Sequence, residues 1–281
     1  MEHVKKPDWL RVRLGGNQKF TQTKKIVESH CLHTICSSGR CPNMGECWER
    51  GTATFMIAGD ICTRSCRFCN TKTGKPLPLN PEEPSNVARS IQLMELKHAV
   101  VTSVDRDDLP DLGAGHWVET INKIKEVNPE TTLEVLIPDF QGRDLLIDDV
   151  CNAFPDVISH NMETIRRLTP QVRSAAKYDV SLSVLKRIAY NGRKAKSGIM
   201  LGLGETHDEI LELMDDLLAV ECYILTIGQY LQPSRKHLPV VEYVTPETFL
   251  KLKEIALKKG FKHVESGPLV RSSYHAEKIL S

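Results

Sequence analysis

The sequence predicts an α/β fold in which six strand-then-helix units form a parallel sheet, either open or curled into a partial (β/α)6 TIM-like barrel. From residue 52 onward, short apolar runs alternate with stretches whose apolar residues recur at helical spacing. Capping signals mark the start of the later helices. Because parallel strands need crossover connections, a βα series of this length favours a parallel sheet with right-handed crossovers.

The strands are predicted from short apolar runs that are bounded by polar residues, glycine or proline. They are TATFMIAG (52–59), HAVVTSV (98–104), TTLEVLIP (131–138), DVISHN (156–161), KSGIMLGLGE (196–205) and YILTIGQYL (223–231). Residues 1–51 lack this alternation and are predicted to form an N-terminal extension. The core is expected over 52–262, and residues 263–281 are expected to form a C-terminal tail.

The helices are predicted from apolar residues that lie three or four positions apart. Such stripes occur at Val87, Ile91 and Met94, at Trp117, Ile121 and Ile124, and at Leu182, Leu185 and Ile188, with a weaker helix over 143–153. Thr206 and Glu209 predict a capping box at the start of the next helix. Thr245 with Pro246 predicts the start of the last helix, and Gly260 predicts its end.

The overall composition excludes several classes of protein. Lys+Arg number 37 and Asp+Glu number 36, so the chain has no general attraction to nucleic acid or to a membrane surface. No apolar run approaches about 18 residues, the length needed to span a bilayer. The N-terminus is charged and has no apolar signal core, so a cytoplasmic protein is expected.

Nine cysteines are present, and seven of them lie between positions 31 and 69. Six form two triads: Cys36, Cys41 and Cys47 with spacing C-x4-C-x5-C, and Cys62, Cys66 and Cys69 with spacing C-x3-C-x2-C. A structural zinc site needs four ligands, whereas a [4Fe–4S] cluster held by three thiolates leaves one iron free for a small chelating molecule. Clustered thiols in a reducing compartment therefore predict metal binding rather than disulfides.

Simpler explanations of the triads remain open at this point. The second triad has i, i+4, i+7 spacing, so its thiols would share one face of a helix and pack in a core. The two triads would also serve a zinc-binding scaffold, with His30 or His33 as further ligands, although six cysteines do not divide into two four-thiolate sites.

Polar residues and glycines gather where the predicted strands end. They are Ser103 and Asp105, His160 and Asn161, Gly202, Gly204 and Glu205, and Gln229. Binding and chemistry collect at the carboxyl ends of parallel strands, so these positions are candidates for cofactor or substrate contacts. For any one of them, the alternative is that loops, and hence polar residues, simply begin at strand ends.

The motif CTRSCRFC (62–69) after the first strand resembles the radical S-adenosylmethionine (SAM) superfamily, and GIMLGLGE (198–205) resembles its glycine-rich stretch near the adenine. The upstream triad, together with TSVDRDDL (102–109), GQYLQPS (228–234) and GPLVRSSYHA (267–276), resembles the lipoyl synthases within that superfamily. This resemblance runs from about Pro7 to about Ala276.

The resemblance implies two [4Fe–4S] clusters and SAM as cofactors. The SAM-binding cluster would be held by Cys62, Cys66 and Cys69, and an auxiliary cluster, which supplies sulfur, by Cys36, Cys41, Cys47 and Ser273. Contacts to SAM or substrate are expected from Ser103, Asp105, Asn161, Gly202, Glu205 and Gln229. The remaining cysteines, Cys31, Cys151 and Cys222, are interpreted as structural or incidental.

The implied reaction replaces hydrogens at C6 and C8 of a protein-bound octanoyl-lysine with two sulfurs. The implied partners are octanoylated lipoyl-carrier proteins such as 2-oxoacid dehydrogenase E2 domains and the glycine cleavage H protein. An electron donor such as ferredoxin or flavodoxin and a cluster-repair carrier are also expected. The alternatives are another radical SAM enzyme with an auxiliary cluster, such as a biotin-synthase-like or methylthio-transferring enzyme, and a non-enzymatic iron–sulfur electron carrier.

Overall fold

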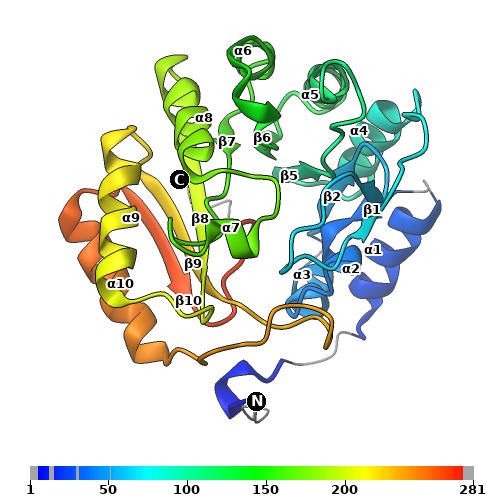
Figure 1. Ribbon diagram of the computed structural model, residues 1–281. Coiled ribbons are helices and arrows are strands. Elements are labelled where there is room, and N and C mark those ends of the chain that lie inside the picture. Colours follow the sequence, from blue (N-terminus) through cyan, green and yellow to red (C-terminus); the bar gives the residue numbers. More distant parts are fainter. Residues whose placement is uncertain (1–5, 13–15, 30–31, 51, 275–281) are drawn as a thin grey trace. The chain divides into compact units, whose positions relative to one another are not determined.

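The computed structural model of the protein describes residues 6–12, 16–29, 32–50 and 52–274 (Figure 1). The chain forms two compact units. Unit 1 takes in the described residues of 1–11, 65–69 and 159–281, and unit 2 those of 12–64 and 70–158. Each unit carries parallel strands followed by helices, which confirms the predicted α/β class.

The sheet of unit 2 has the strand order β1 (His33–Thr34), β2 (Thr54–Ile57), β5 (His98–Ser103) and β6 (Thr132–Leu136). Strands β2, β5 and β6 are parallel, whereas β1 pairs antiparallel with β2. A separate parallel pair is formed by β3 (Ile61–Cys62) and β4 (Lys72–Thr73). The helices of this unit are α1 (Gln18–Ser29), α2 (Ile35–Ser38), α3 (Met44–Glu49), α4 (Glu83–Leu93), α5 (Ala114–Val127) and α6 (Asp144–Asn152), with a 3-10 turn at Phe140–Gly142.

Unit 1 carries three parallel strands in the order β8 (Ala195–Leu201), β9 (Ile224–Gln229) and β10 (His263–Gly267). The short strand β7 (Val157–Ser159) contains the point at which the chain passes from unit 2 to unit 1. The helices of unit 1 are α7 (Thr169–Val172), α8 (Tyr178–Tyr190), α9 (His207–Ala219) and α10 (Pro246–Lys259), with a 3-10 turn at Asp8–Leu10.

The core of each unit follows from the apolar periodicity of the sequence. Every residue of β2 and of β9 is buried, as expected of parallel strands that are covered on both faces. In α5, the predicted stripe of Trp117, Ile121 and Ile124 is buried. No described helix is long and apolar enough to cross a membrane.

All six predicted strands are present, but four further strands, β1, β3, β4 and β10, were missed. Strand β10 lies in the segment expected to be a tail, and β1 lies in the predicted N-terminal extension. The predicted strand over 196–205 ends at Leu201, because Gly202 and Gly204 have φ of 99° and 103° and turn the chain out of the sheet. Strands β1 and β10 each have one neighbour, β2 and β9, so the sheet is open, as in a partial barrel.

Helix α9 begins with the predicted capping box. Thr206 N donates to Glu209 Oε2 at 2.8 Å, and Glu209 N donates to Thr206 Oγ1 at 3.4 Å. Both bonds satisfy backbone donors that have no partner within the helix. The cap therefore fixes the point where the glycine-rich loop over 202–205 meets the helix.

Removing this cap is expected to destabilise the protein. Thr206→Ala should lower the free energy of unfolding by about 1 kcal/mol, since alanine offers no acceptor to the first turn. Urea unfolding followed by circular dichroism measures the change. Ser183→Ala, which removes an exposed hydroxyl from within α8, is the control and should have little effect. An unchanged midpoint for Thr206→Ala would show that the box contributes nothing to stability.

Candidate active site

Cys62 lies at the end of β3, on the first loop after β2, and its sulfur is surrounded by donors. Its Sγ accepts hydrogen bonds from the backbone N–H of Arg64 at 3.4 Å and of Asp105 at 3.3 Å. N–H groups that point at a sulfur favour its anionic form, which is the form that binds metal. The carboxylate oxygen Oδ2 of Asp105 also lies 3.6 Å from the sulfur. Two backbone N–H groups and one carboxylate thus surround the Cys62 sulfur, and its role as a metal ligand stays a prediction.

Arg64, two residues further on, is the centre of an ion-pair network within unit 2. Its Nε and Nη2 donate to Asp107 at 2.7 and 2.8 Å, and its Nη1 and Nη2 donate to Asp139, both at 2.8 Å. Asp105 Oδ1 lies 3.4 Å from Nη1. Two bidentate pairs to carboxylates fix a guanidinium in one plane and one orientation. The loop that carries Cys62 is therefore attached to the segments after β5 and β6.

The contacts within this network raise or lower the pKa of each charged group. Burial opposes the charge of Arg64, but the hydrogen bonds that it donates to Asp107 and Asp139 outweigh this effect and raise the pKa of the guanidinium. The hydrogen bond from Arg64 lowers the pKa of Asp107 despite partial burial. Burial raises the pKa of Asp105, and Arg64 only partly offsets this effect. Three carboxylates face one guanidinium, so the surroundings of Cys62 are rich in acidic groups.

Ser103, at the carboxyl end of β5, carries an orphaned hydroxyl. Its Oγ is buried and has no hydrogen-bond partner among the described residues. Buried hydroxyls are normally satisfied, so an exception at a strand end marks a position where a bound molecule would supply the partner. Ser103 therefore fits the predicted role as a contact to SAM or substrate, which stays a prediction.

Cys66 and Cys69 belong to unit 1, in the short segment over 65–69. Cys69 N donates to Cys66 O at 3.0 Å, which closes a tight turn between the two cysteines. The segment is held by Arg67, whose N donates to Val172 O at 3.0 Å and whose carbonyl accepts from Leu238 N at 3.2 Å. His237 Nε2 lies 3.0 Å from Cys69 O. The loop after β9 thus positions the second half of the cysteine motif.

The first triad, Cys36, Cys41 and Cys47, lies on α2, on α3 and on the turn between them. The three side chains pack in and against the core that includes Trp48 and Ala53. Burial raises the pKa of Cys36, and the charge of Cys41 raises it further. Burial likewise raises the pKa of Cys47 to about 12, with added repulsion from Cys36 and Cys41. The three sulfurs are therefore close enough to interact, and together they form a soft donor set that a cation would convert to thiolates.

Among residues 6–12, 16–29, 32–50 and 52–274, no three or more His, Cys, Asp or Glu side chains are gathered in the geometry of a metal site. The two ligand sets, including Ser273, stay predictions. Of the other cysteines, Cys151 and Cys222 are buried, while Cys31 lies outside the described residues.

The glycine-rich loop after β8 is closed by Glu205. Its carboxylate accepts from Gly202 N and, at 3.0 Å, from Leu203 N. Gln229, at the end of β9, is buried and uses its amide to bind backbone: Nε2 donates to Leu201 O and Glu242 O, both at 3.0 Å. These bonds define structural roles for both side chains. Their predicted contact with SAM or substrate stays a prediction.

Asn161 and Ser273 lie in the same unit, on the segment after β7 and in the C-terminal tail. Asn161 Nδ2 donates to Ser272 Oγ at 2.7 Å, next in sequence to Ser273. Its Oδ1 is buried without a partner among the described residues. Ser273 lies within a turn that Tyr274 N closes by donating to Arg271 O at 2.9 Å. The sequence predicted a contact of Asn161 with SAM or substrate, which stays a prediction, but did not show its contact with the tail.

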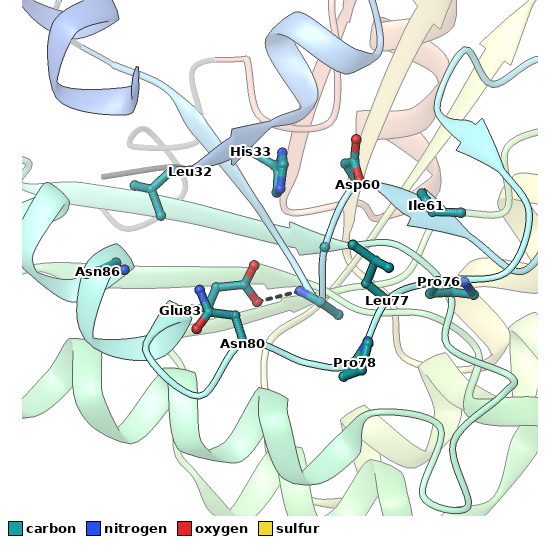
Figure 2. A pocket seen from close by; sticks show the side chains of 12 residues that line it. Leu32, His33, Asp60, Ile61, Pro76, Leu77, Pro78, Asn80, Glu83 and Asn86 are labelled. Carbon is teal, nitrogen blue, oxygen red and sulfur yellow. Dashed lines mark hydrogen bonds between the residues drawn. The ribbon is translucent and has the colours of Figure 1, made fainter. Parts of the chain in front are cut away.

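A pocket of about 150 Å³ lies beside the loop that leads to Cys62 (Figure 2). Its apolar wall includes Ile61 and Leu77, and its floor includes Glu83. Figure 2 shows the Glu83 side chain directed at the backbone of Ala58, whose N donates to Glu83 Oε2 at 2.7 Å. His116 Nε2 lies 2.6 Å from the same oxygen. Glu83 thereby supports the turn at Ala58, which has a φ of 66°.

Sequence reasoning missed several residues that shape the site. Neither Arg64 nor Asp139 was singled out. A signal existed for Arg64, because an arginine between two predicted thiolate ligands has to be paired. For Asp139 and Lys196 no local signal exists, since their partners lie far away in the sequence.

Comparison with known proteins agrees with this geometry. The profile of the Radical SAM superfamily matches residues 56–217. A protein named lipoyl synthase from Parabacteroides distasonis is 75% identical over 279 residues, which is 99% of this chain and 99% of that protein. The lipoyl synthase of Treponema denticola is 60% identical over 278 residues, covering 99% of this chain and 96% of its own length.

Solved structures with low sequence identity share the fold. A methylornithine synthase superposes with a TM-score of 0.55 at 12% identity, covering 92% of this chain and 85% of that one. SuiB from Streptococcus suis, bound to its precursor peptide SuiA, gives a TM-score of 0.62 at 10% identity, covering 88% of this chain and 52% of that one. The fold, the superfamily profile and the near full-length relatives agree: the chain belongs to the lipoyl synthase family of the radical SAM superfamily.

Proposed function

We propose that this protein inserts two sulfur atoms, at C6 and C8, into an octanoyl chain that is amide-linked to a lysine of a carrier protein. The observation that carries the proposal is the presence of two cysteine triads, because C-x3-C-x2-C alone is shared by the whole superfamily. The first triad, Cys36, Cys41 and Cys47, provides a separate donor set for a cluster that would store sulfur. Family membership supports the same activity.

The substrate explains why such cofactors are needed. A methylene of an alkyl chain has no acidic proton, so a general base cannot start the reaction. When bound, the SAM-binding cluster and SAM supply a carbon-centred radical that abstracts a hydrogen atom, and the auxiliary cluster supplies sulfide. The protein's part is to hold the two cofactors, orient the chain and keep water away.

The residues around Cys62 are suited to the first of these tasks. Backbone N–H groups of Arg64 and Asp105 stabilise a thiolate at Cys62. Cys66 and Cys69 are the other two ligands of the SAM-binding cluster in this proposal. The buried, unpartnered Oγ of Ser103 is available for SAM or substrate. The Gly202 and Glu205 loop gives a defined backbone at the end of β8, where the adenine of SAM is proposed to lie.

The first triad and Ser273 are assigned to the auxiliary cluster. A serine oxygen is a harder ligand than a thiolate and matches iron less well. An iron held by Ser273 would therefore be released more easily than one held by cysteine, which suits a cluster that gives up its sulfur. The turn over 271–274 presents Ser273 from a tail that is itself fixed to β8 and β9.

The remaining partners follow from the same assignment. We infer octanoylated E2 domains of 2-oxoacid dehydrogenases and the glycine cleavage H protein as substrates. Ferredoxin or flavodoxin is inferred as the electron donor, and an iron–sulfur carrier is inferred to rebuild the auxiliary cluster. The near-equal numbers of acidic and basic residues support a protein that binds neither nucleic acid nor membranes. All of these steps are proposed to take place in the cytoplasm.

Replacing each triad by alanine should separate two activities. Cys36→Ala, Cys41→Ala and Cys47→Ala together should leave cleavage of SAM measurable but abolish lipoyl product, because the sulfur store is lost. Cys62→Ala, Cys66→Ala and Cys69→Ala together should abolish SAM cleavage and leave one cluster. Anaerobic iron and sulfide analysis, with mass spectrometry of an octanoyl-lysine peptide, measures both. Cys151→Ala is the matched control, and SAM cleavage by the second triple variant would refute the assignment.

Ser273 is expected to act in sulfur transfer rather than in cluster assembly. Ser273→Ala should still assemble both clusters, since three thiolates suffice to hold a cube, but should fail at or before sulfur transfer. Ser273→Cys should slow turnover, because a thiolate binds iron more firmly than a hydroxyl does. Single-turnover yields of mono- and dithiolated peptide test both variants against Ser183→Ala. Wild-type yields from Ser273→Ala would leave the residue a role in the local backbone only.

The Arg64 network is expected to be required for the Cys62 loop. Arg64→Met should destabilise the apoprotein by about 3 kcal/mol, because it leaves the buried Asp139 without its cation. Iron retention and SAM cleavage should also fall in Arg64→Met. Arg64→Lys should restore little, since one ammonium cannot replace two bidentate pairs. Arg166→Met, at a half-exposed surface ion pair, is the control. Equal stability, iron retention and SAM cleavage in Arg64→Met and Arg166→Met would contradict this role.

A further inference from the structure

The C-terminal tail crosses two strands of unit 1 at glycines. β10 and the tail after it are the last part of the chain (red in Figure 1). A Cβ atom on Gly228 of β9 would overlap the carbonyl oxygen of Val270. A Cβ on Gly198 of β8 would lie 2.6 Å from Thr226 Oγ1 and 3.3 Å from Ser272 Oγ. Glycine at 228 lets the backbone of the tail approach β9 this closely, and glycine at 198 leaves room for the side chains of Thr226 and Ser272, so both strands accommodate the tail.

We call the surface around Gly198 and Gly228 the cradle. Two side chains hold Ser272 in this cradle. Lys196 Nζ donates to its carbonyl oxygen at 2.6 Å, and Asn161 Nδ2 donates to its Oγ at 2.7 Å. Lys196 is only 1% exposed, although lysine is rarely buried without a specific partner. A hydrogen bond from a buried ammonium is among the strong ones in proteins. One residue of the tail is therefore fixed through both its backbone and its side chain.

The amide of Asn161 is itself oriented by its neighbours. Its Nδ2 also donates to Glu163 Oε1 at 3.0 Å. Glu163 is anchored to β8, because its N donates to Gly198 O at 3.0 Å and its O accepts from Met200 N at 2.9 Å. Both hydrogens of the Asn161 amide are thus used inside unit 1. The segment after β7 and strand β8 together aim this amide at Ser272.

Ser272 and Ser273 lie in the same turn, so the position of Ser272 restricts that of Ser273. Tyr274 N donates to Arg271 O at 2.9 Å, so Ser272 and Ser273 are the two central residues of a four-residue turn. A second bond, from Val270 N to Gly267 O at 3.0 Å, ties the tail to the end of β10. With Ser272 held and the turn closed, the backbone of Ser273 has one conformation.

We propose that Lys196 and Asn161, with the cradle of Gly198 and Gly228, are positioning elements that set the place of Ser273 as an iron ligand. They act through Ser272 and touch neither cluster nor SAM in this role. The inference rests on the proposed function of Ser273, and it adds residues of β8 and of the segment after β7 to the machinery of the auxiliary cluster. Lys196 is the most direct test, because methionine has a similar length and no charge.

The first measurement is hydrogen exchange of the tail in the full-length protein. Lys196→Met should speed exchange in the peptide that covers 270–274 by about tenfold or more, the effect of losing one strong hydrogen bond. Gly228→Ala should do the same by pushing the tail off β9. Lys196→Arg, which keeps a cation, should restore much of the protection. Lys186→Met, an exposed lysine on α8, should leave exchange in 270–274 unchanged.

The second measurement reads the auxiliary cluster itself. In a background of Cys62→Ala, Cys66→Ala and Cys69→Ala only that cluster is expected to assemble, and Mössbauer spectroscopy reports whether one iron differs from the other three. Ser273→Ala should alter the signature of that one iron. Lys196→Met should alter it in the same way, and Lys196→Arg should return it toward that of the parent.

The outcomes separate this inference from the proposed function. If Ser273→Ala leaves the spectrum of the parent unchanged, the assignment of Ser273 as a ligand is wrong, and the positioning role falls with it. If Ser273→Ala changes the spectrum but Lys196→Met does not, the ligand assignment holds and the positioning role alone is overturned. Unchanged exchange of 270–274 in both Lys196→Met and Gly228→Ala would also overturn it, because the tail would then not depend on the cradle.

Discussion

A thiol that is to bind iron has to be available as a thiolate, whereas burial in a protein favours the neutral form. The rest of this structure depends on how that conflict is met. At Cys62 the protein supplies two backbone N–H groups to the sulfur. At Cys36 and Cys47 it does the opposite, because burial and neighbouring thiols raise the pKa. Cys62 therefore has hydrogen-bond donors at its sulfur, whereas Cys36 and Cys47 lie where burial favours the neutral thiol.

Acidic groups surround the Cys62 sulfur because they belong to the ion-pair network that fixes its loop. Arg64 supplies one positive charge, and Asp105, Asp107 and Asp139 surround it. The guanidinium satisfies four hydrogen bonds to two of these carboxylates, so the network is fixed in geometry even though its charges do not cancel. Negatively charged carboxylates disfavour the addition of an electron to any group that lies near them. Rigidity of the cysteine loop and its electrostatics therefore come from the same residues.

Much of this was predictable from the sequence because it is local. The six predicted strands, the Thr206 and Glu209 capping box and the two cysteine triads all depend on residues within about ten positions of one another. Strand β10 was missed because HVESG has only one buried residue, Val264, and its pairing with β9 is what makes it a strand. The bond between Lys196 and Ser272 spans 76 residues and leaves no periodic signal. Long-range contacts of this kind are decided by the fold and not by local pattern.

The packing of the C-terminal tail on β8 and β9 has a consequence for the order in which the protein folds. The bond from Asn161 to Ser272 joins residues 111 positions apart. Closing so long a loop costs conformational entropy that only a preformed sheet can offset, so the tail can dock only after β8 and β9 have paired. A protein in which the tail has docked is therefore one whose last sheet strands are already in register. Docking of the final turn thus reports that the strands of unit 1 have already paired.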